Sequence, residues 1–379
     1  MVIGFDAKRI VRNATGLGSY GRTLVNDLAV TGGLNLRLYA PDEGRDDLRN
    51  QVVKLPNVNF CYPSFHNSSS AFLPVKKALW RSYGIVKTLK QDGVQLYHGL
   101  SGELPVGIHK SGIKSVVTIH DLIFLRHPEY YNRVDVHLYR WKFWQALKEA
   151  DHIVAISDCT RRDIIELGEV QNDSRISVIY QSFAPRFSAE VSQEVCKEVR
   201  MRYGLPQRFI LNVGTIEPRK NVLLAAKALK QLPKDLALVI VGRRTSYTNE
   251  ILEYIGLYSL SHRVFMLHDV SDADLPALYA QAECFVYPSR YEGFGIPIVE
   301  AISCGLPVVA CTGSCLEEAG GPDSLYVGPD DANGMAAAIS QVLQGANGRD
   351  ERIRRSQQYI QRFANASTAQ QYKEIYSNL

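Results

Sequence analysis

The chain has 379 residues, of which 46% are hydrophobic and 22% are charged, values that are ordinary for a soluble globular protein. That length suggests two domains, each able to bury a core without disulfides. A formal net charge of +4 is too small to indicate nucleic-acid binding. In the sequence, no apolar run reaches the roughly 18 residues that a membrane-spanning helix needs.

The seven cysteines are scattered without a pairing rhythm. Cys311 and Cys315 are closest together, but no second pair or histidine cluster in the sequence completes a zinc site. We therefore expect reduced, mostly buried thiols. The chain also opens on a predicted strand and not on a signal sequence. Both features predict a cytoplasmic protein.

In the first half of the chain, short β-rich runs alternate with longer helical stretches. Strands are expected at residues 2–5, 34–39, 94–98, 115–119, 152–156 and 176–180, with helices at 20–29 and 133–149. Strands separated by helices predict a parallel sheet that is covered on both faces.

The pattern then restarts. Strands are expected at residues 209–213, 236–241, 264–267, 284–287 and 307–310, with helices at 222–230, 297–303 and within 350–379. This predicts an α/β protein with domains at 1–187 and 188–362, and a C-terminal helix at 363–379 that returns to the first domain. Ligands of such sheets bind at the carboxyl ends of the strands, so we expect the site in a cleft between the domains.

The strongest motif follows the predicted strand 284–287. A glycine-bearing turn, Glu-Gly-Phe-Gly at 292–295, leads into a helix that begins near Pro297. Backbone amides at such a turn can hold a diphosphate. Glu292 on the loop and Glu300 in the first helical turn can both reach hydroxyls of one extended ligand. The alternative is a plain strand-turn-helix with surface glutamates.

A second motif, Gly-Thr-Ile-Glu-Pro-Arg-Lys-Asn at 214–221, directly follows the strand 209–213. Arg219 can bind a diphosphate leaving group through two parallel hydrogen bonds, and Lys220 can bind it through its single positive charge. The alternative is a solvated loop with ordinary charges.

Two further motifs lie in the first domain. His120 follows the strand 115–119, where it could face a ligand or be a satisfied histidine at a strand end. Residues 16–21, Gly-Leu-Gly-Ser-Tyr-Gly, match a dinucleotide fingerprint, but about ten residues separate them from their strand. We therefore expect a flexible loop over the bound ligands, or else a glycine-rich turn with only a packing role.

Together these motifs resemble glycosyltransferase family 4, and the resemblance covers nearly the whole chain. It implies that His120 faces the reacting sugar, that Glu292 binds donor hydroxyls, and that Lys220 and Arg219 bind the leaving phosphate. The family often has an arginine where this chain has Thr215, which leaves open whether Arg219 replaces that contact. The implied donor-binding residues are Gly16, Gly18, Thr215, Val270, Asp272, Ser289, Gly293, Phe294, Gly295, Ile296 and, at the ribose, Glu300.

The resemblance also implies a GT-B fold, two Rossmann-like parallel-sheet domains facing a central cleft. It implies retaining transfer of a hexose, best matched by mannose from GDP-mannose, to a glycan or polyprenyl-linked acceptor in polysaccharide synthesis. We expect no cofactor and no essential metal, because Asp-Ala-Asp at 272–274 is interpreted as a helix start. The alternatives are a sugar-nucleotide epimerase, a dinucleotide-dependent oxidoreductase and a catalytically silent binding protein.

A basic, aromatic-rich stretch suggests a membrane partner. No acidic residue occurs between Asp47 and Asp92, where lysines and arginines mix with Phe65, Phe72, Trp80 and other aromatics. Residues 74–89 predict an amphipathic helix that could rest on the inner face of an anionic membrane. The alternative is a surface helix whose apolar side packs on the sheet while its cations face water.

Overall fold

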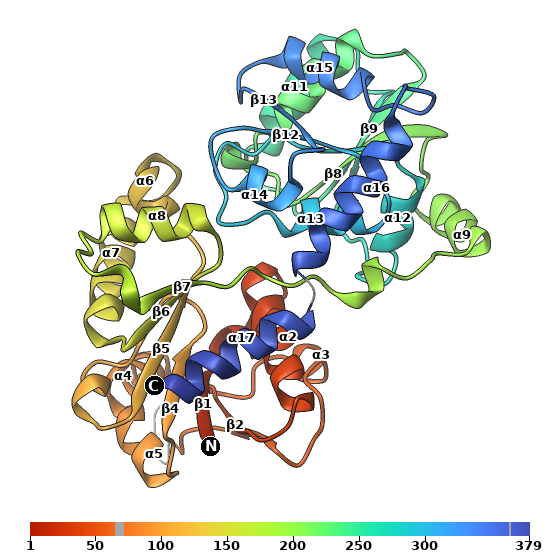
Figure 1. Ribbon diagram of the computed structural model, residues 1–379. Helices are drawn as coiled ribbons and strands as arrows, with labels where there is room; N and C mark the ends of the chain where they lie inside the picture. Colours follow the sequence, from red (N-terminus) through yellow and green to blue (C-terminus); the bar gives the residue numbers. More distant parts are fainter. Residues whose placement is uncertain (65–71, 364) are drawn as a thin grey trace. The chain divides into compact units, whose positions relative to one another are not determined.

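The protein is described by a computed structural model that covers residues 1–64, 72–363 and 365–379. The chain forms two compact units, residues 1–182 with 363–379, and residues 183–362. Each unit is built on its own parallel sheet (Figure 1). Phe65, one aromatic of the basic stretch, lies outside the described residues.

The sheet of the first unit has strand order β3-β2-β1-β4-β5-β6-β7, and all neighbouring strands are parallel. Its strands are β1 (Val2–Asp6), β2 (Asn35–Tyr39), β3 (Val58–Cys61), β4 (Leu96–Gly99), β5 (Lys114–Ile119), β6 (His152–Ala155) and β7 (Ile176–Val178). The sequence did not predict β3, because this edge strand is only partly buried and lacks a continuous apolar run.

Helices cover both faces of this first sheet. They are α1 (Lys8–Arg12), α2 (Gly16–Val30), α3 (Asp46–Arg49), α4 (Leu73–Leu79), α5 (Ile85–Gln91), α6 (Ile123–Arg126), α7 (Arg133–Glu149), α8 (Asp158–Leu167) and α17 (Asn365–Asn378). One core contains buried residues of α1, α2 and α17. A second core contains residues of α5, α7 and α8.

The second unit repeats this architecture with strand order β10-β9-β8-β11-β12-β13. Its strands are β8 (Arg208–Val213), β9 (Leu236–Val241), β10 (Val264–Leu267), β11 (Cys284–Tyr287), β12 (Val308–Cys311) and β13 (Leu325–Val327). Its helices are α9 (Gln193–Tyr203), α10 (Val222–Ala228), α11 (Thr248–Leu257), α12 (Leu275–Gln281), α13 (Ile296–Ser303), α14 (Leu316–Gly320), α15 (Ala332–Ser340) and α16 (Arg349–Ile360). Two Rossmann-like parallel sheets confirm the predicted fold class.

The C-terminal helix α17 packs into the first unit, although it follows the second unit in sequence (Figure 1). The Tyr376 hydroxyl lies 2.7 Å from Nδ1 of His98, and Nε2 of His98 lies 2.8 Å from the Thr118 hydroxyl. The Tyr372 hydroxyl lies 2.5 Å from that of Tyr20 on α2. This buried polar network fixes α17 against β4, β5 and α2.

The division between the units comes about five residues before the predicted boundary at 187/188. The 3-10 turn Pro185–Phe187 belongs to the second unit. Phe187 is fully buried, and its ring lies 5.7 Å from that of Tyr279 on α12. This connector, with one proline, therefore looked like a linker in sequence but packs as part of the second core.

A helical run is present at the predicted residues 74–89, but the apolar positions expected on it, including Val75, Leu79 and Ile85, do not share one side. Helices α4 and α5 are joined by a π-helix, Trp80–Gly84, which adds a residue to the turn. As a result, Val75 and Leu79 are exposed whereas Ile85 and Leu89 are buried. The alternative, a surface helix whose apolar side packs on the sheet, also fails for the first half of this run, because the apolar side chains of that half face outward.

Two of the cations expected on that helix surface point inward. Arg81 forms ion pairs with Asp6 on β1 and with Glu103, and its side chain is only 11% exposed. Lys77 lies 2.6 Å from Asp42. Since these charges are already paired within the first unit, they are poorly placed to meet an anionic surface. Among the described residues, no helix is long and apolar enough to cross a membrane.

Candidate functional site

The predicted leaving-group cations and Glu292 meet at the carboxyl edge of the second sheet. Lys220 and Glu292 follow β8 and β11, which are neighbours in this sheet. Nζ of Lys220 lies 2.5 Å from one carboxylate oxygen of Glu292, and a guanidinium nitrogen of Arg219 lies 2.9 Å from the other. Lys220 also donates to the Tyr287 hydroxyl at 2.7 Å.

Asn221 holds the loop between β8 and α10 in position. Its backbone has a left-handed φ of 53° and its side-chain amide donates to the carbonyls of Pro288 and Pro329. The backbone amide of Arg290 also donates a hydrogen bond to the carbonyl of Arg219 at 2.9 Å. Asparagine tolerates this backbone region better than most residues. The loops after β8 and β11 are thus locked together, which the sequence alone did not reveal.

The ionic cluster strongly biases its members toward their charged forms. Burial alone would raise the pKa of Glu292, but the charges of Lys220 and Arg219 lower it to about 2. Burial would likewise lower the pKa of Lys220, yet Glu292 raises it above its ordinary value. Both cations pair with Glu292, and Arg219 also forms an ion pair with Glu217 at 2.7 Å. An anionic diphosphate could therefore share or exchange these contacts.

The glycine turn after β11 is buried and tightly packed. Gly295 has a φ of 106° and immediately precedes Ile296, the first residue of α13. A side chain at Gly295 would meet Leu316 at 3.1 Å. Phe294 is 2% exposed and Ser289 is fully buried. The predicted turn-to-helix geometry at 293–296 is present, and its phosphate contacts stay a prediction.

Glu300 lies in the second turn of α13, not in the first turn as predicted, because the helix begins at Ile296. Its carboxyl group accepts from the Tyr279 hydroxyl at 3.3 Å. Burial raises the pKa of Glu300 to about 7, while the Arg186 charge and the Tyr279 hydrogen bond act in the opposite direction. Arg186 and Tyr279 are neighbours of the site that sequence reasoning missed.

The predicted nucleotide-base segment follows β10. Val270 is half-buried, and the Asp272 carboxylate lies 3.8 Å from Arg186. Asp274 immediately precedes α12, and its carboxylate accepts from Arg202 at 2.7 Å and from Tyr203 at 2.8 Å. Asp274 is thus the residue before the helix, as predicted, but its carboxylate makes no capping hydrogen bond and the first turn of α12 has no acidic residue. Among the described residues, no group of three or more potential ligands is arranged for a metal ion.

In the first unit, His120 directly follows β5 and is nearly buried. Its Nε2 donates to the Leu100 carbonyl at 2.8 Å, so Nδ1 is the acceptor for the Gln181 amide at 3.0 Å. Burial lowers the pKa of His120 to about 4. The side chain is therefore neutral at pH 7, with its tautomer fixed by the backbone.

The expected flexible loop at 16–21 is wrong, since Gly16 is the first residue of helix α2. A Cβ at Gly18 would lie 1.8 Å from the Asn13 carbonyl oxygen, and one at Gly21 would lie 2.9 Å from Ile10. These glycines allow α2 to pack closely on the preceding chain. The motif belongs to the first unit, and the cluster around Glu292 belongs to the second.

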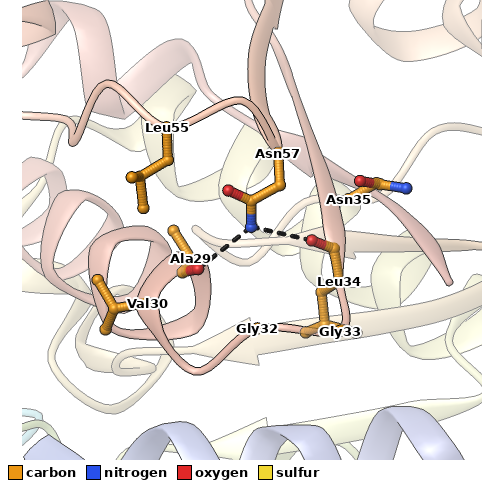
Figure 2. Close-up of a pocket in the computed structure, with 8 residues that line it drawn as sticks. All are labelled: Ala29, Val30, Gly32, Gly33, Leu34, Asn35, Leu55 and Asn57. Atoms are coloured by element: carbon orange, nitrogen blue, oxygen red, sulfur yellow. Dashed lines mark hydrogen bonds between the residues drawn. The ribbon is translucent and has the colours of Figure 1, made fainter.

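A separate hollow of about 710 Å³ lies at the opposite, amino-terminal edge of the first sheet (Figure 2). Its floor is closed by the Asn57 amide, which donates to the carbonyls of Ala29 and Leu34 at 3.1 Å each. It contains none of the predicted site residues. Since ligands of parallel sheets bind at the carboxyl ends, we do not assign this hollow to the site.

Known protein families match both units of the chain. The model described as Glycosyltransferase Family 4 matches residues 14–183, and that described as Glycosyl transferases group 1 matches residues 200–359. The chain is 31% identical over 365 residues to O-antigen chain mannosyltransferase B of Escherichia coli, covering 92% of each chain. The chain belongs to glycosyltransferase family 4. It is a nucleotide-sugar-dependent glycosyltransferase.

Other relatives of this family 4 glycosyltransferase support the assignment. O-antigen chain mannosyltransferase RfbU of Salmonella typhimurium is 29% identical over 228 residues, covering 60% of each chain. The structure of HepE from Anabaena, solved with UDP and glucose, matches with a TM-score of 0.76 and 20% identity. That match covers 100% of this chain and 99% of HepE, and at this identity it shows the fold alone.

Proposed function

We propose that this glycosyltransferase transfers mannose from GDP-mannose, with retention of configuration, to a glycan or polyprenyl-linked acceptor of surface polysaccharide synthesis. The observation that carries the proposal is the ionic cluster of Arg219, Lys220 and Glu292 at the carboxyl edge of the second sheet. The names of the two mannosyltransferase relatives support the choice of sugar.

Each residue of the donor site has a proposed role. Arg219, Lys220 and the amides of Phe294 and Gly295 hold the diphosphate, while Glu292 orients the mannosyl hydroxyls. The remaining proposed donor contacts are Gly16, Gly18, Thr215, Val270, Asp272, Ser289, Gly293, Ile296 and Glu300. Glu300 accepts from ribose hydroxyls, next to the Tyr279 hydroxyl that already reaches its carboxyl group.

The proposed reaction is a front-face displacement. The bond between the anomeric carbon and the departing phosphate oxygen breaks, and the acceptor oxygen forms its bond on the same face. The acceptor proton passes to the departing phosphate. Lys220 and Arg219 stabilise negative charge where it develops, and neutral His120 orients the sugar. Two cations at the diphosphate support the proposal that no metal ion is required.

Calorimetric titration of the purified protein with GDP and with UDP tests the proposed base. GDP should bind more tightly, and GDP-mannose should be consumed when an acceptor is supplied. Tighter UDP binding without GDP-mannose turnover would exclude this donor. Conversion of the donor to an epimeric nucleotide sugar without an acceptor would instead favour the epimerase alternative.

We further propose that the enzyme works at the cytoplasmic face of an anionic membrane, where a lipid-linked acceptor would lie. The excess of basic over acidic residues in 1–188 supports this location. The inward position of Lys77 and Arg81 means that other groups must make the contact.

A further inference from the structure

The first unit exposes large apolar side chains on two helical runs. On α4 and the π-helix, Val75, Leu79 and Tyr83 are each more than half exposed. They are spaced by four residues, which places them along one side of the run. On α7, Leu138, Trp141 and Trp144 are 37–46% exposed and follow one another at intervals of three residues, again along one side.

These two runs share a core and a carboxylate. Ile85 and Leu89 of α5 and Phe143 of α7 belong to the same buried cluster on one face of the first sheet. Glu103 binds Arg81 of the π-helix and also accepts from Lys142 of α7 at 3.1 Å. The inner sides of both runs are therefore fixed to the same support, and their outer sides face solvent.

We infer that these outward-facing side chains form one membrane-contacting surface, the apolar flank, that inserts into the interface of an anionic bilayer. The apolar flank is defined by Val75, Leu79, Tyr83, Leu138, Trp141 and Trp144. It rests on the proposed membrane location, but not on the identity of the donor. Tryptophan and tyrosine favour the membrane interface, because they combine an apolar ring with a polar group.

Charge complementarity selects an anionic bilayer as the occupant. Within residues 72–91 and 133–149, the exposed cations are Lys76, Lys87, Lys90, Arg133, Arg140 and Lys148. Asp135 is the exposed acid within these two ranges, because Glu149 is buried and accepts from the Gly107 and His109 amides. A protein partner with an acidic rim would need a fixed complementary shape, whereas a bilayer accepts any convex apolar surface with a basic border.

Co-sedimentation with vesicles tests the inference on the full-length chain. The probes are phosphatidylcholine vesicles with and without phosphatidylglycerol, at low and high salt. The variant is Leu138→Ser with Trp141→Ser, and the matched control is Met201→Ser with Leu257→Ser, two residues that are each 75% exposed in the second unit. We expect the flank variant to bind anionic vesicles about tenfold more weakly, because it loses apolar burial, and the control to bind like wild type.

Tryptophan emission gives an independent readout, because the chain has three tryptophans and two of them lie in the apolar flank. In a Trp80→Phe variant, anionic vesicles should shift the emission of Trp141 and Trp144 to shorter wavelength. No wild-type binding at low salt, or equal binding by the flank variant, would overturn the inference. Dimers that the flank variant abolishes, without vesicle binding, would also overturn it and assign the surface to a second copy. Failure of GDP-mannose transfer would affect only the donor proposal.

Discussion

At the scale of single residues, the site is a cluster of ion-paired side chains whose two cations are fixed in position. Glu292 carries two cationic partners, and its pKa of about 2 means that it is ionised at neutral pH. Lys220 also donates to Tyr287, so its ammonium is fixed even without substrate. Such fixed charges need little rearrangement when negative charge develops on a leaving group.

Replacing Lys220 with alanine should lower turnover by about 100-fold or more, the usual loss when one charge-stabilising donor is removed. Lys227→Ala is the matched control, because Lys227 is exposed on the neighbouring helix α10. Steady-state kinetics with saturating donor compares the variants. Turnover of Lys220→Ala within a few-fold of the control would remove Lys220 from the leaving-group role.

Replacing His120 or Glu292 with alanine should reduce the transfer rate far more than nucleotide affinity, because both are proposed to face the sugar. Calorimetry with GDP and single-turnover kinetics separate the two quantities. Loss of nucleotide binding with the transfer rate preserved at saturation would reverse these assignments.

Nucleotide affinity should depend on pH through Glu300. Its pKa of about 7 means that the carboxylate, which we propose accepts from the ribose, forms as pH rises. From pH 6 to 8 the ionised fraction increases about tenfold, and affinity should follow. Glu300→Gln should lose this pH-dependent gain in affinity. Titrating nucleotide into wild type and into the variant at each pH therefore separates the effect of Glu300 from that of nucleotide ionisation.

The stability without nucleotide should change in the opposite sense. Because the folded pKa of Glu300 is above its ordinary value, the folded state retains a proton that the unfolded chain releases. Its stabilising contribution is complete below about pH 4.5 and is lost as pH rises through about 7. An identical pH dependence of melting for wild type and Glu300→Gln would contradict this assignment.

That Lys220 and Glu292 lie at one site follows from sequence reasoning, because both motifs come directly after strands, and carboxyl ends of parallel strands meet at one edge. Their direct ion pair was not predicted. The contacts of Glu300 with Arg186 and Tyr279 could not be obtained this way. They depend on how a connector and helix α12 pack against α13. No local pattern encodes that packing.

At the scale of elements, the helical run at 73–91 is anchored through charge. Arg81 binds Asp6, which is 3% exposed on β1, and also Glu103. The pKa of Asp6 stays below its ordinary value even though burial opposes ionisation, because Arg81 lies beside it. Removing one partner would leave a buried charge without compensation.

Arg81→Ala should therefore destabilise the protein by about 3–5 kcal/mol, as expected when a buried ion pair loses one partner. Urea denaturation measures the change, and Lys87→Ala, an exposed site on the same run, is the control. Combining Arg81→Met with Asp6→Asn should recover much of the loss. A change no larger than that of the control would show that Asp6 finds another partner.

At the scale of the whole molecule, both sheets and most strands could be predicted because buried parallel strands form continuous apolar runs, such as β9 with six buried residues. The edge strands β3 and β13 are only partly buried and were missed. The edge strand β10 is also partly buried, but its uninterrupted apolar run Val264–Leu267 allowed it to be predicted. The exact division between units could not be predicted, since Phe187 looks like linker but packs on Tyr279.

Removing residues after Arg362 should unfold the first unit while the second still binds nucleotide. The truncation deletes Ala369, Tyr372 and Tyr376 from the first core, and each lost aromatic costs about 3–5 kcal/mol. Hydrogen exchange should show lost protection in β1 and β4 and retained protection in β8 and β11. Glu374→Gln, exposed on the same helix, is the control. Protection retained in β1 would contradict the expected dependence on α17.

The π-helix at Trp80–Gly84 makes the 73–91 run sensitive to length. Because of this extra residue, the inward row is Lys77, Arg81, Ile85 and Leu89, and the outward row is Val75, Leu79, Tyr83 and Lys87. A single-residue deletion there would restore an uninterrupted α-helix and rotate its first half by about 100° against its second. Homologues that lack this residue should therefore carry a different pattern of apolar and basic positions before it. The length of this one segment therefore decides, together with its apolar side chains, whether a homologue can present the same surface.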